Sequence, residues 1–242
     1  MPGLRRSTLT RLGFALLALA ACLACVRAGF WQWHKGADRE GQWQRFAQGA
    51  AQVIPLGSAA LASVPLYQRV SLTGTLDGAH QFLLDNRSYQ ERAGYEVLTP
   101  LARPGGGVVL VDRGWVPFTG SRAHLPEVSL AAGPAVTLTG RVDTLPSAGL
   151  SLGHAAPAGA WPKVTAFPSM DELAAALGSA LEPRLLLLDP QAPDGYVRDW
   201  RPPGMSPLRH YSYAIQWWSF AALAVLAWGV MTVRHSRGRA RP

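Results

Sequence analysis

Two histidines that border apolar stretches are the side chains with the best capacity to bind a metal. His34 follows the apolar residues 12–33, and His210 begins a second stretch that ends at Val233. In an antiparallel pair of membrane spans, both histidines would lie at the same depth, near one face of the bilayer. Imidazole is an axial ligand of haem iron and also a ligand of copper. The alternative is that each histidine is only an amphipathic anchor at the interface, and the residue types alone leave both interpretations open.

Arg113 is a candidate for holding a carboxylate. It lies in the sequence Asp112-Arg113-Gly114-Trp115, where a strand is expected to end. A guanidinium can bind a carboxylate, such as a haem propionate, through two parallel hydrogen bonds. The alternative is that Arg113 pairs with Asp112 and fixes a corner of the sheet.

Sequence motifs of the common enzyme classes are absent. There is no Gly-x-Ser-x-Gly nucleophile motif, no phosphate-binding glycine loop and no His-Glu-x-x-His. Residues 104–107 are rich in glycine, but a strand is expected to follow them, so they predict a turn. Asp85, Asp112 and Asp189 are all expected at strand ends, where aspartates usually stabilise turns. An enzyme is therefore the least favoured class of function.

The first apolar stretch has two interpretations. A basic leader, an apolar core and small residues before Cys22 resemble a cleaved signal sequence, even a lipoprotein processing site. We favour an uncleaved span, because the apolar run continues past Cys22 and ends in Phe30, Trp31 and Trp33, which can anchor it at the interface. Cys22 and Cys25 have the spacing of a redox or metal pair, but within an apolar helix they are interpreted as small packing residues.

The net charge of +8 arises from the tails and one position beside the first span. Eight arginines flank the apolar stretches, whereas residues 35–209 contain fifteen basic and fifteen acidic residues and are neutral. This pattern places both termini in the cytoplasm and exports the segment between the spans. It also argues against nucleic-acid binding, because no basic surface is left in the central domain.

The central segment is predicted to be β-rich (α+β), an antiparallel sheet or open barrel with one or two helices. Residues 33–52 are expected to continue the first helix beyond the membrane. A helix over residues 169–181 is predicted from the capping sequence that begins at Ser169 with Glu172 three residues later. Alternation of apolar and polar residues, or a short apolar run, predicts strands over 68–77, 81–85, 95–101, 108–116, 135–143 and 185–189.

Several motifs, taken in this order between two spans, resemble the surfeit locus protein 1 family, membrane proteins that assist the assembly of haem–copper (cytochrome c) oxidases. The first apolar stretch ends in Gly-Phe-Trp-Gln at residues 29–32, and Val-Ser-Leu-Thr-Gly follows at 70–74. Gly-Tyr-Glu-Val-Leu-Thr-Pro occupies residues 94–100, and Val-Leu-Val-Asp-Arg-Gly-Trp-Val-Pro occupies 109–117. The second stretch opens with His-Tyr-Ser-Tyr-Ala-Ile-Gln-Trp at 210–217.

The resemblance implies an assembly factor, not an enzyme, that inserts haem a into the catalytic subunit or stabilises it there. His210 matches the histidine to which haem a binding is attributed in bacterial members, so it would be an axial ligand of a transiently and non-covalently bound haem a. A second ligand role for His34 is our own inference. Further residues expected to shape the pocket or contact the oxidase are Trp31, Gln32, Tyr213, Gln216 and Trp217.

Two positions depart from the family pattern. Lys35 stands where the family usually has an arginine, so it keeps a positive charge for a propionate but lacks the planar guanidinium. Asp112 replaces the usual asparagine. The alternative function is a membrane scaffold for the oxidase subunit that does not itself bind haem.

The implied partners are cytochrome c oxidase subunit 1, other assembly factors and the membrane, and a homo-oligomer is left open. The composition favours a bacterial inner membrane with a periplasmic domain. The predicted organisation is a basic cytoplasmic N-terminus at 1–11, a first transmembrane helix at 12–33, the periplasmic domain at 34–208, a second transmembrane helix at 209–233 and a basic cytoplasmic tail at 234–242.

Overall fold

The computed structural model describes residues 3–49, 51–105, 107–146, 157 and 159–239. Gly106 of the predicted turn and the last three residues of the predicted tail lie outside them. The chain divides into two units, one made of residues 1–43 and 204–242 and the other of residues 44–203. The first unit contains two long helices, and the second is β-rich, as expected.

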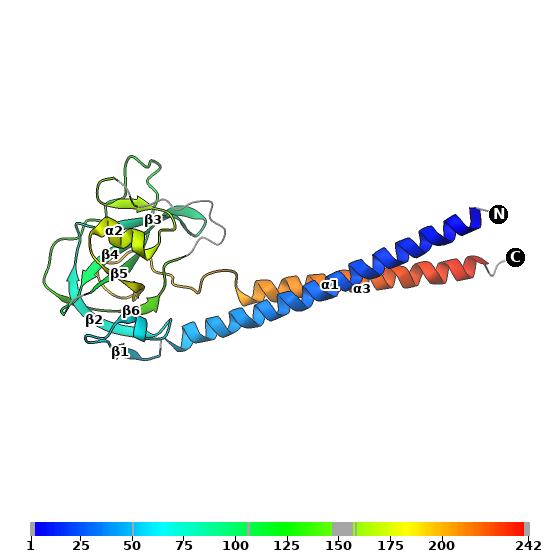
Figure 1. The fold of residues 1–242 in the computed structure, drawn as a ribbon, viewed down its shortest axis with the longest axis horizontal. Coiled ribbons are helices and arrows are strands. Elements are labelled where there is room, and N and C mark those ends of the chain that lie inside the picture. The colour runs from blue at the N-terminus through cyan, green and yellow to red at the C-terminus, as the bar shows by residue number, and fades with distance from the viewer. Residues whose placement is uncertain (1–2, 50, 106, 147–156, 158, 240–242) are drawn as a thin grey trace. The chain divides into compact units, whose positions relative to one another are not determined.

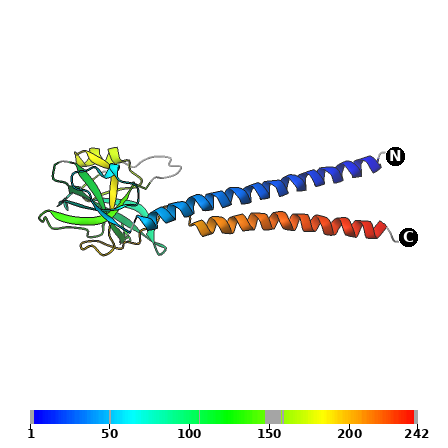
Figure 2. The ribbon, with the colours of Figure 1, turned by 90° about the horizontal axis from the view of Figure 1, so that it is seen from below.

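Helices α1 (Gly3–Gln48) and α3 (Pro207–Arg239) lie side by side and antiparallel, so that the start of α1 and the end of α3 are at the same end of the pair (Figures 1 and 2). Within them, residues 12–48 and 207–234 are long and apolar enough to cross a membrane. Their large apolar side chains, such as Leu16, Leu23 and Leu226, are more than half exposed. Such exposure has a large cost in water and none in lipid, which agrees with helices that cross a membrane.

Close approach of the two helices depends on two glycines of α1. A Cβ atom on Gly29 would lie 2.2 Å from Nε1 of Trp218, and one on Gly36 would lie 2.6 Å from Cε1 of Tyr211. Small residues at helix interfaces let large neighbouring side chains pack against the backbone. The aromatic residues that open α3 therefore pack against α1 at these two positions.

The second unit is a closed five-stranded barrel rather than the predicted antiparallel sheet or open barrel. The barrel strands are β2 (Arg69–Leu76), β4 (Arg92–Ala102), β5 (Val108–Pro117), β6 (Val136–Asp143) and β8 (Leu181–Leu188). They pair in the order β2-β6-β8-β5-β4, and β4 pairs again with β2 through Thr75 with Ala102 and Leu76 with Leu101. The pairing of β5 with β8 is parallel. Closure removes the free edges that an open sheet would expose.

Three more strands extend the barrel sheet. They are β1 (Val53–Pro55), β3 (Phe82–Tyr89) and β7 (Lys163–Thr165). The strand predicted at 81–85 is thus longer than expected, and the two three-residue strands were not predicted. Both short strands pair in parallel with a longer one, β1 with β2 and β7 with β3. Three residues give too little alternation to be recognised in a sequence.

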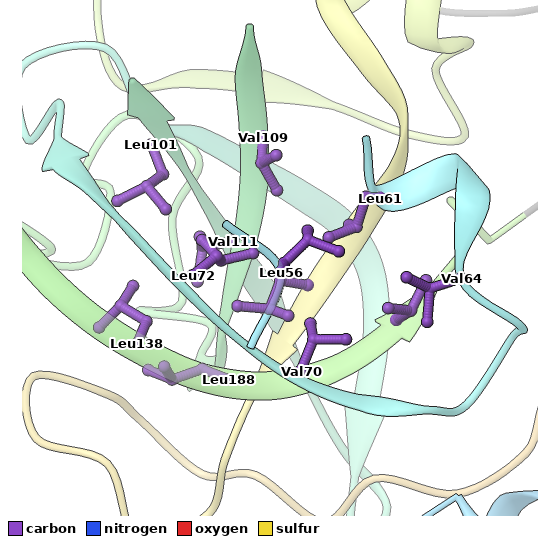
Figure 3. Packing of buried hydrophobic residues seen from close by; sticks show 12 residues of the cluster. Leu56, Leu61, Val64, Val70, Leu72, Leu101, Val109, Val111, Leu138 and Leu188 are labelled. Atoms are coloured by element: carbon purple, nitrogen blue, oxygen red, sulfur yellow. The ribbon is translucent and has the colours of Figure 1, made fainter. Parts of the chain in front are cut away.

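Aliphatic side chains from all five barrel strands fill the barrel. Figure 3 shows that Leu72, Leu101, Val111, Leu138 and Leu188 point toward one another. On β8 the run of four leucines is buried throughout, because the strand is flanked by β5 and β6 and covered on both faces. The short 3-10 helix η1 (Leu61–Ser63) adds Leu61 to the same cluster.

Helix α2 (Met170–Leu177) begins as predicted and ends earlier. The hydroxyl of Ser169 accepts a hydrogen bond from the backbone N–H of Glu172, and the Glu172 carboxylate accepts one from the backbone N–H of Ser169. Gly178 then takes a left-handed conformation with φ of 73°, which ends the helix four residues before the predicted limit. Leu173 is fully buried in a second apolar cluster with Phe82.

Candidate functional site

His210 lies in the first turn of α3 and is buried against α1, with 8% of its surface exposed. Its Nδ1 lies 2.8 Å from Oε1 of Gln32. An amide oxygen can only accept a hydrogen bond, so Nδ1 donates to Gln32, and in a neutral imidazole this leaves the lone pair on Nε2. Metal-binding histidines are commonly oriented by such a hydrogen bond on the other ring nitrogen. The His210 ring is therefore held in the tautomer that can bind a metal through Nε2.

Aromatic packing next to His210 fixes the two helices at this level. The ring centroids of Trp33 and Tyr211 are 4.7 Å apart, and those of Phe30 and Trp218 are 5.3 Å apart. The Tyr211 hydroxyl donates a 2.8 Å hydrogen bond to the Glu40 carboxylate. Trp33 and Glu40 of α1 thus contact Tyr211, the neighbour of His210, and Phe30 contacts Trp218, about two turns further along α3. These contacts support the position of His210 relative to Gln32.

His34 does not converge with His210. Its Nδ1 donates a 2.7 Å hydrogen bond to the carbonyl oxygen of Phe30 in its own helix, and the side chain is exposed. Residues two positions apart on an α-helix are separated by about 200° of rotation around its axis. His34 therefore faces away from the side on which Gln32 contacts His210. Its role as a second axial ligand stays a prediction.

Lys35 is exposed one turn beyond Gln32 on α1. Residues three apart lie on neighbouring positions of one helix face. The ammonium group is therefore on the same side of α1 as the glutamine that orients His210, where it can pair with an anionic group of a ligand bound there.

Tyr213 and Gln216 share a surface recess of 440 Å³ at the start of α3. Ser206, Leu208, Arg209 and Ser212 complete its lining. His210 is not among the lining residues. Trp217 and Trp31 are also exposed, and Trp217 packs edge to face against Phe220 of its own helix at 6.0 Å. The structure thus brings Gln32 to His210 but directs these four other predicted site residues outward.

Arg113 belongs to the barrel unit and is buried, with 3% of its surface exposed. Its Nη1 donates to Oε1 of Gln81 at 2.9 Å, and its Nε donates to the carbonyl oxygen of Asp194 at 2.7 Å. Tyr196 stacks over the guanidinium at 5.0 Å. The hydrogen-bond acceptors of its guanidinium are therefore a side-chain amide oxygen and a backbone carbonyl oxygen.

Asp112 lies in the middle of β5 and not at the expected strand end. Its side chain accepts a 2.9 Å hydrogen bond from the backbone N–H of Gly114. Burial raises the pKa of Asp112 well above its usual value, and the nearby charge of Glu96 raises it further.

An apolar groove of 330 Å³ between α1 and α3 was not predicted. It is lined by Ala15, Ala18, Leu19, Cys22, Ala224, Val225 and Trp228. At its edge the Cys22 thiol lies 3.8 Å from the carbonyl oxygen of Ala221, and both cysteines are free. The small alanine and cysteine side chains leave this space open between the two helices. The groove could not be predicted from the sequence, because its two walls come from opposite ends of the chain.

The sequence model of the SURF1 family matches residues 19–222, which include His210, Gln32 and the whole barrel. The chain belongs to the SURF1 family. SURF1 proteins are in general factors for the assembly of cytochrome oxidase, and the family is not a known class of enzyme. The predicted resemblance is thereby confirmed.

Relatives of similar length occur in mycobacteria. Uncharacterized SURF1-like proteins of Mycobacterium bovis and Mycobacterium tuberculosis are 31% identical to this SURF1 chain over 246 residues, covering 95% of it and 86% of each relative. Together with the two apolar helices, these relatives agree with the predicted bacterial membrane protein.

Proposed function

We propose that this SURF1 protein holds haem a transiently through Nε2 of His210 while a cytochrome c oxidase is assembled. Haem a is cargo here, and it supplies an iron with a free axial position. The observation that carries the proposal is the hydrogen bond between His210 Nδ1 and Gln32. It leaves a single oriented nitrogen donor at the opening of an apolar helix.

One nitrogen donor suits a carrier that must release its cargo. Among the residues that the structure describes, no group of three or more His, Cys, Asp and Glu side chains could hold a bare metal ion. A single imidazole suits an iron that already has a macrocycle around it, because the macrocycle supplies the other ligands. Without covalent attachment, release to subunit 1 requires only the exchange of one axial bond.

The surroundings of His210 match the amphipathic character of haem a. Exposed apolar side chains of α3 follow His210 toward its C-terminus, where a hydrocarbon tail can lie in lipid. Lys35 provides a cation for a propionate on the side of Gln32. We propose that both termini are cytoplasmic and that the site lies at the periplasmic edge of the bilayer, with His210 at the height where ring and propionates leave the lipid.

The direct test is the absorbance spectrum of the full-length protein purified from cells that make haem a. The parent protein should show a reduced haem a band, and His210→Ala should lose most of it. His34→Ala removes the other imidazole of the helix pair, which is hydrogen-bonded to Phe30. An unchanged band in this variant leaves His210 as the single ligand, and a weakened band identifies His34 as the second ligand. Equal haem content in the parent and in His210→Ala would contradict the proposal.

A scaffold that binds the oxidase subunit without haem is the second candidate. It is favoured by the exposure of Tyr213, Trp217 and Trp31, since exposed aromatic side chains are frequent in protein interfaces. Co-purification of subunit 1 separates the two functions. If the parent and His210→Ala both retain subunit 1 and neither contains haem, the scaffold function is the correct one.

A further inference from the structure

The mouth of the barrel contains a cavity of 480 Å³ that the proposed haem function does not use. Its apolar wall consists of Leu76, Val111, Val136, Leu138 and Leu188, which come from four of the barrel strands. Three of them, Val111, Leu138 and Leu188, are visible in Figure 3 at the inner face of the barrel. The volume is in the range of ordinary ligand pockets, and the mouths of barrels are frequent positions for them.

Arg113 is the charged group of this cavity. Its side chain lines the cavity, is 97% buried, and donates through Nε and Nη1 to Asp194 and Gln81 as described above. Among the residues that the structure describes, neither an ion pair nor a hydrogen bond engages its Nη2. A largely buried guanidinium without a carboxylate partner is unfavourable, because it has lost most of its hydration and gained no opposite charge.

A second guanidinium adds to the positive charge at the mouth. Arg198 donates to the carbonyl oxygens of Asp189 and Ala192, both at 2.8 Å, and so holds the loop that borders the cavity. Burial and then the charge of Arg113 lower the pKa of Arg198, and the charge of Asp189 opposes this shift in part. The two cations therefore repel one another.

The acidic groups that line the mouth leave this charge largely uncompensated. The Asp189 carboxylate is paired with Arg69, whose Nε lies 3.2 Å from its Oδ1. Asp194 contributes its backbone carbonyl to Arg113, and the residue is exposed to solvent, where its charge is screened. The mouth is thus an apolar cavity with a cationic group at its wall.

We propose that this barrel mouth binds a small amphipathic carboxylate, with the carboxylate on Arg113 and the hydrocarbon chain against the apolar wall. A carboxylate would fill the open donor position of Arg113 and neutralise a buried cation. The apolar wall would in turn select against small inorganic anions, which have no hydrocarbon part to bury. The site is built from barrel residues alone and does not depend on haem binding at His210.

The probe is octanoate, titrated calorimetrically into haem-free full-length protein in lipid nanodiscs, with empty nanodiscs subtracted. Saturable binding is expected for octanoate, whereas the uncharged octanamide and inorganic phosphate should bind at least 10-fold more weakly. Arg113→Gln should weaken octanoate binding by roughly 10-fold or more, the loss typical of a hydrogen bond to a charged group. Arg184→Gln is the matched control, because Arg184 also donates to a backbone carbonyl, that of Val64, but does not line the cavity.

A second variant keeps the proposal testable if Arg113→Gln does not fold, as judged by circular dichroism. Val136→Phe places a larger apolar side chain in the half-buried wall and should abolish octanoate binding without removing a charge. Unchanged octanoate affinity in either folded variant, equal binding of octanamide or phosphate, or no binding above empty nanodiscs would overturn the proposal.

Two further octanoate titrations distinguish this site from the proposed haem site. His210→Ala should bind octanoate as tightly as the parent protein, whether or not His210 binds haem. Haem-loaded protein should also retain octanoate binding. Loss of octanoate binding on haem loading would mean that a haem propionate is the carboxylate on Arg113, and the independent site would be excluded.

Discussion

The helix pair and the barrel satisfy their backbone polar groups in opposite ways. In α1 and α3 the backbone hydrogen bonds are made within one helix, so the side chains are left to face the surroundings and a few partners on the other helix. In the barrel the bonds join strands that are far apart in the chain, as Thr75 and Ala102 do where β2 meets β4. Local changes should therefore affect only the contacts between the helices, whereas changes inside the barrel should affect the folding of the whole unit.

The largest effect is expected from removing a barrel core side chain. Leu186→Ala deletes a fully buried side chain of β8 and should lower the free energy of unfolding by about 2–5 kcal/mol. Leu23→Ala removes the same atoms from an exposed position of α1 and should change it by no more than about 0.5 kcal/mol. Urea unfolding in detergent, followed by tryptophan fluorescence, measures both. Similar losses in the two variants would remove the distinction between the units.

A second variant breaks the helix pair without touching the barrel. Gly29→Val places atoms where the Trp218 ring lies and should weaken the association of the helices by about 1–3 kcal/mol. In a Cys25→Ser, Ala221→Cys background, the yield of a disulfide between residues 22 and 221 reports that association, because Cys22 lies beside Ala221. Gly13→Val is the control, since a Cβ atom there meets nothing within 4 Å. A yield unaffected by Gly29→Val would contradict the packing described.

The third change acts on one polar contact between the helices. Gln32→Leu removes the acceptor of the His210 Nδ1 proton and should weaken haem binding by roughly 10- to 100-fold, the usual effect of losing such an orienting group. Gln32→Glu keeps an acceptor and should retain binding. Spectroscopic titration with haem compares the two. Gln32→Leu also leaves Nδ1 of His210 without its acceptor when no haem is bound, so the variant could disturb the protein itself. An unchanged melting temperature of the barrel checks that the change is confined to the helix pair.

The smallest effect is expected from the charge of Asp112 in the barrel. The raised pKa means that the folded state binds more protons than the unfolded state between the ordinary aspartate pKa of about 4 and the raised value. Stability should therefore fall as the pH rises through this window, and Asp112→Asn should flatten that part of the curve. Urea unfolding at a series of pH values measures the slope, with the exposed Asp199→Asn as control. An unchanged slope in Asp112→Asn would show that Glu96 or another group is responsible.

Prediction from the sequence succeeded where the signal is local. The capping box at Ser169 and Glu172 specified the start of α2, because both partners lie within one turn. The strands over residues 68–77 and 135–143 were recognised by their alternation and occur as β2 and β6, paired through Leu72 with Leu138. The strand predicted over residues 108–116 occurs as β5, but Asp112 was interpreted as a residue of a strand end, whereas its pairing with β4 and β8 places it inside the sheet.

By itself the sequence determined the two apolar helices, most of the barrel strands and the position of His210 at the opening of α3. These depend on periodicity and composition, which are properties of neighbouring residues. The tertiary structure alone decided the closure of the barrel, the tautomer of His210, the burial of Asp112 and the open donor of Arg113. Each of these depends on partners from distant parts of the chain, such as Gln32 for His210 and Asp194 for Arg113, and no local pattern encodes which distant residue will be the partner.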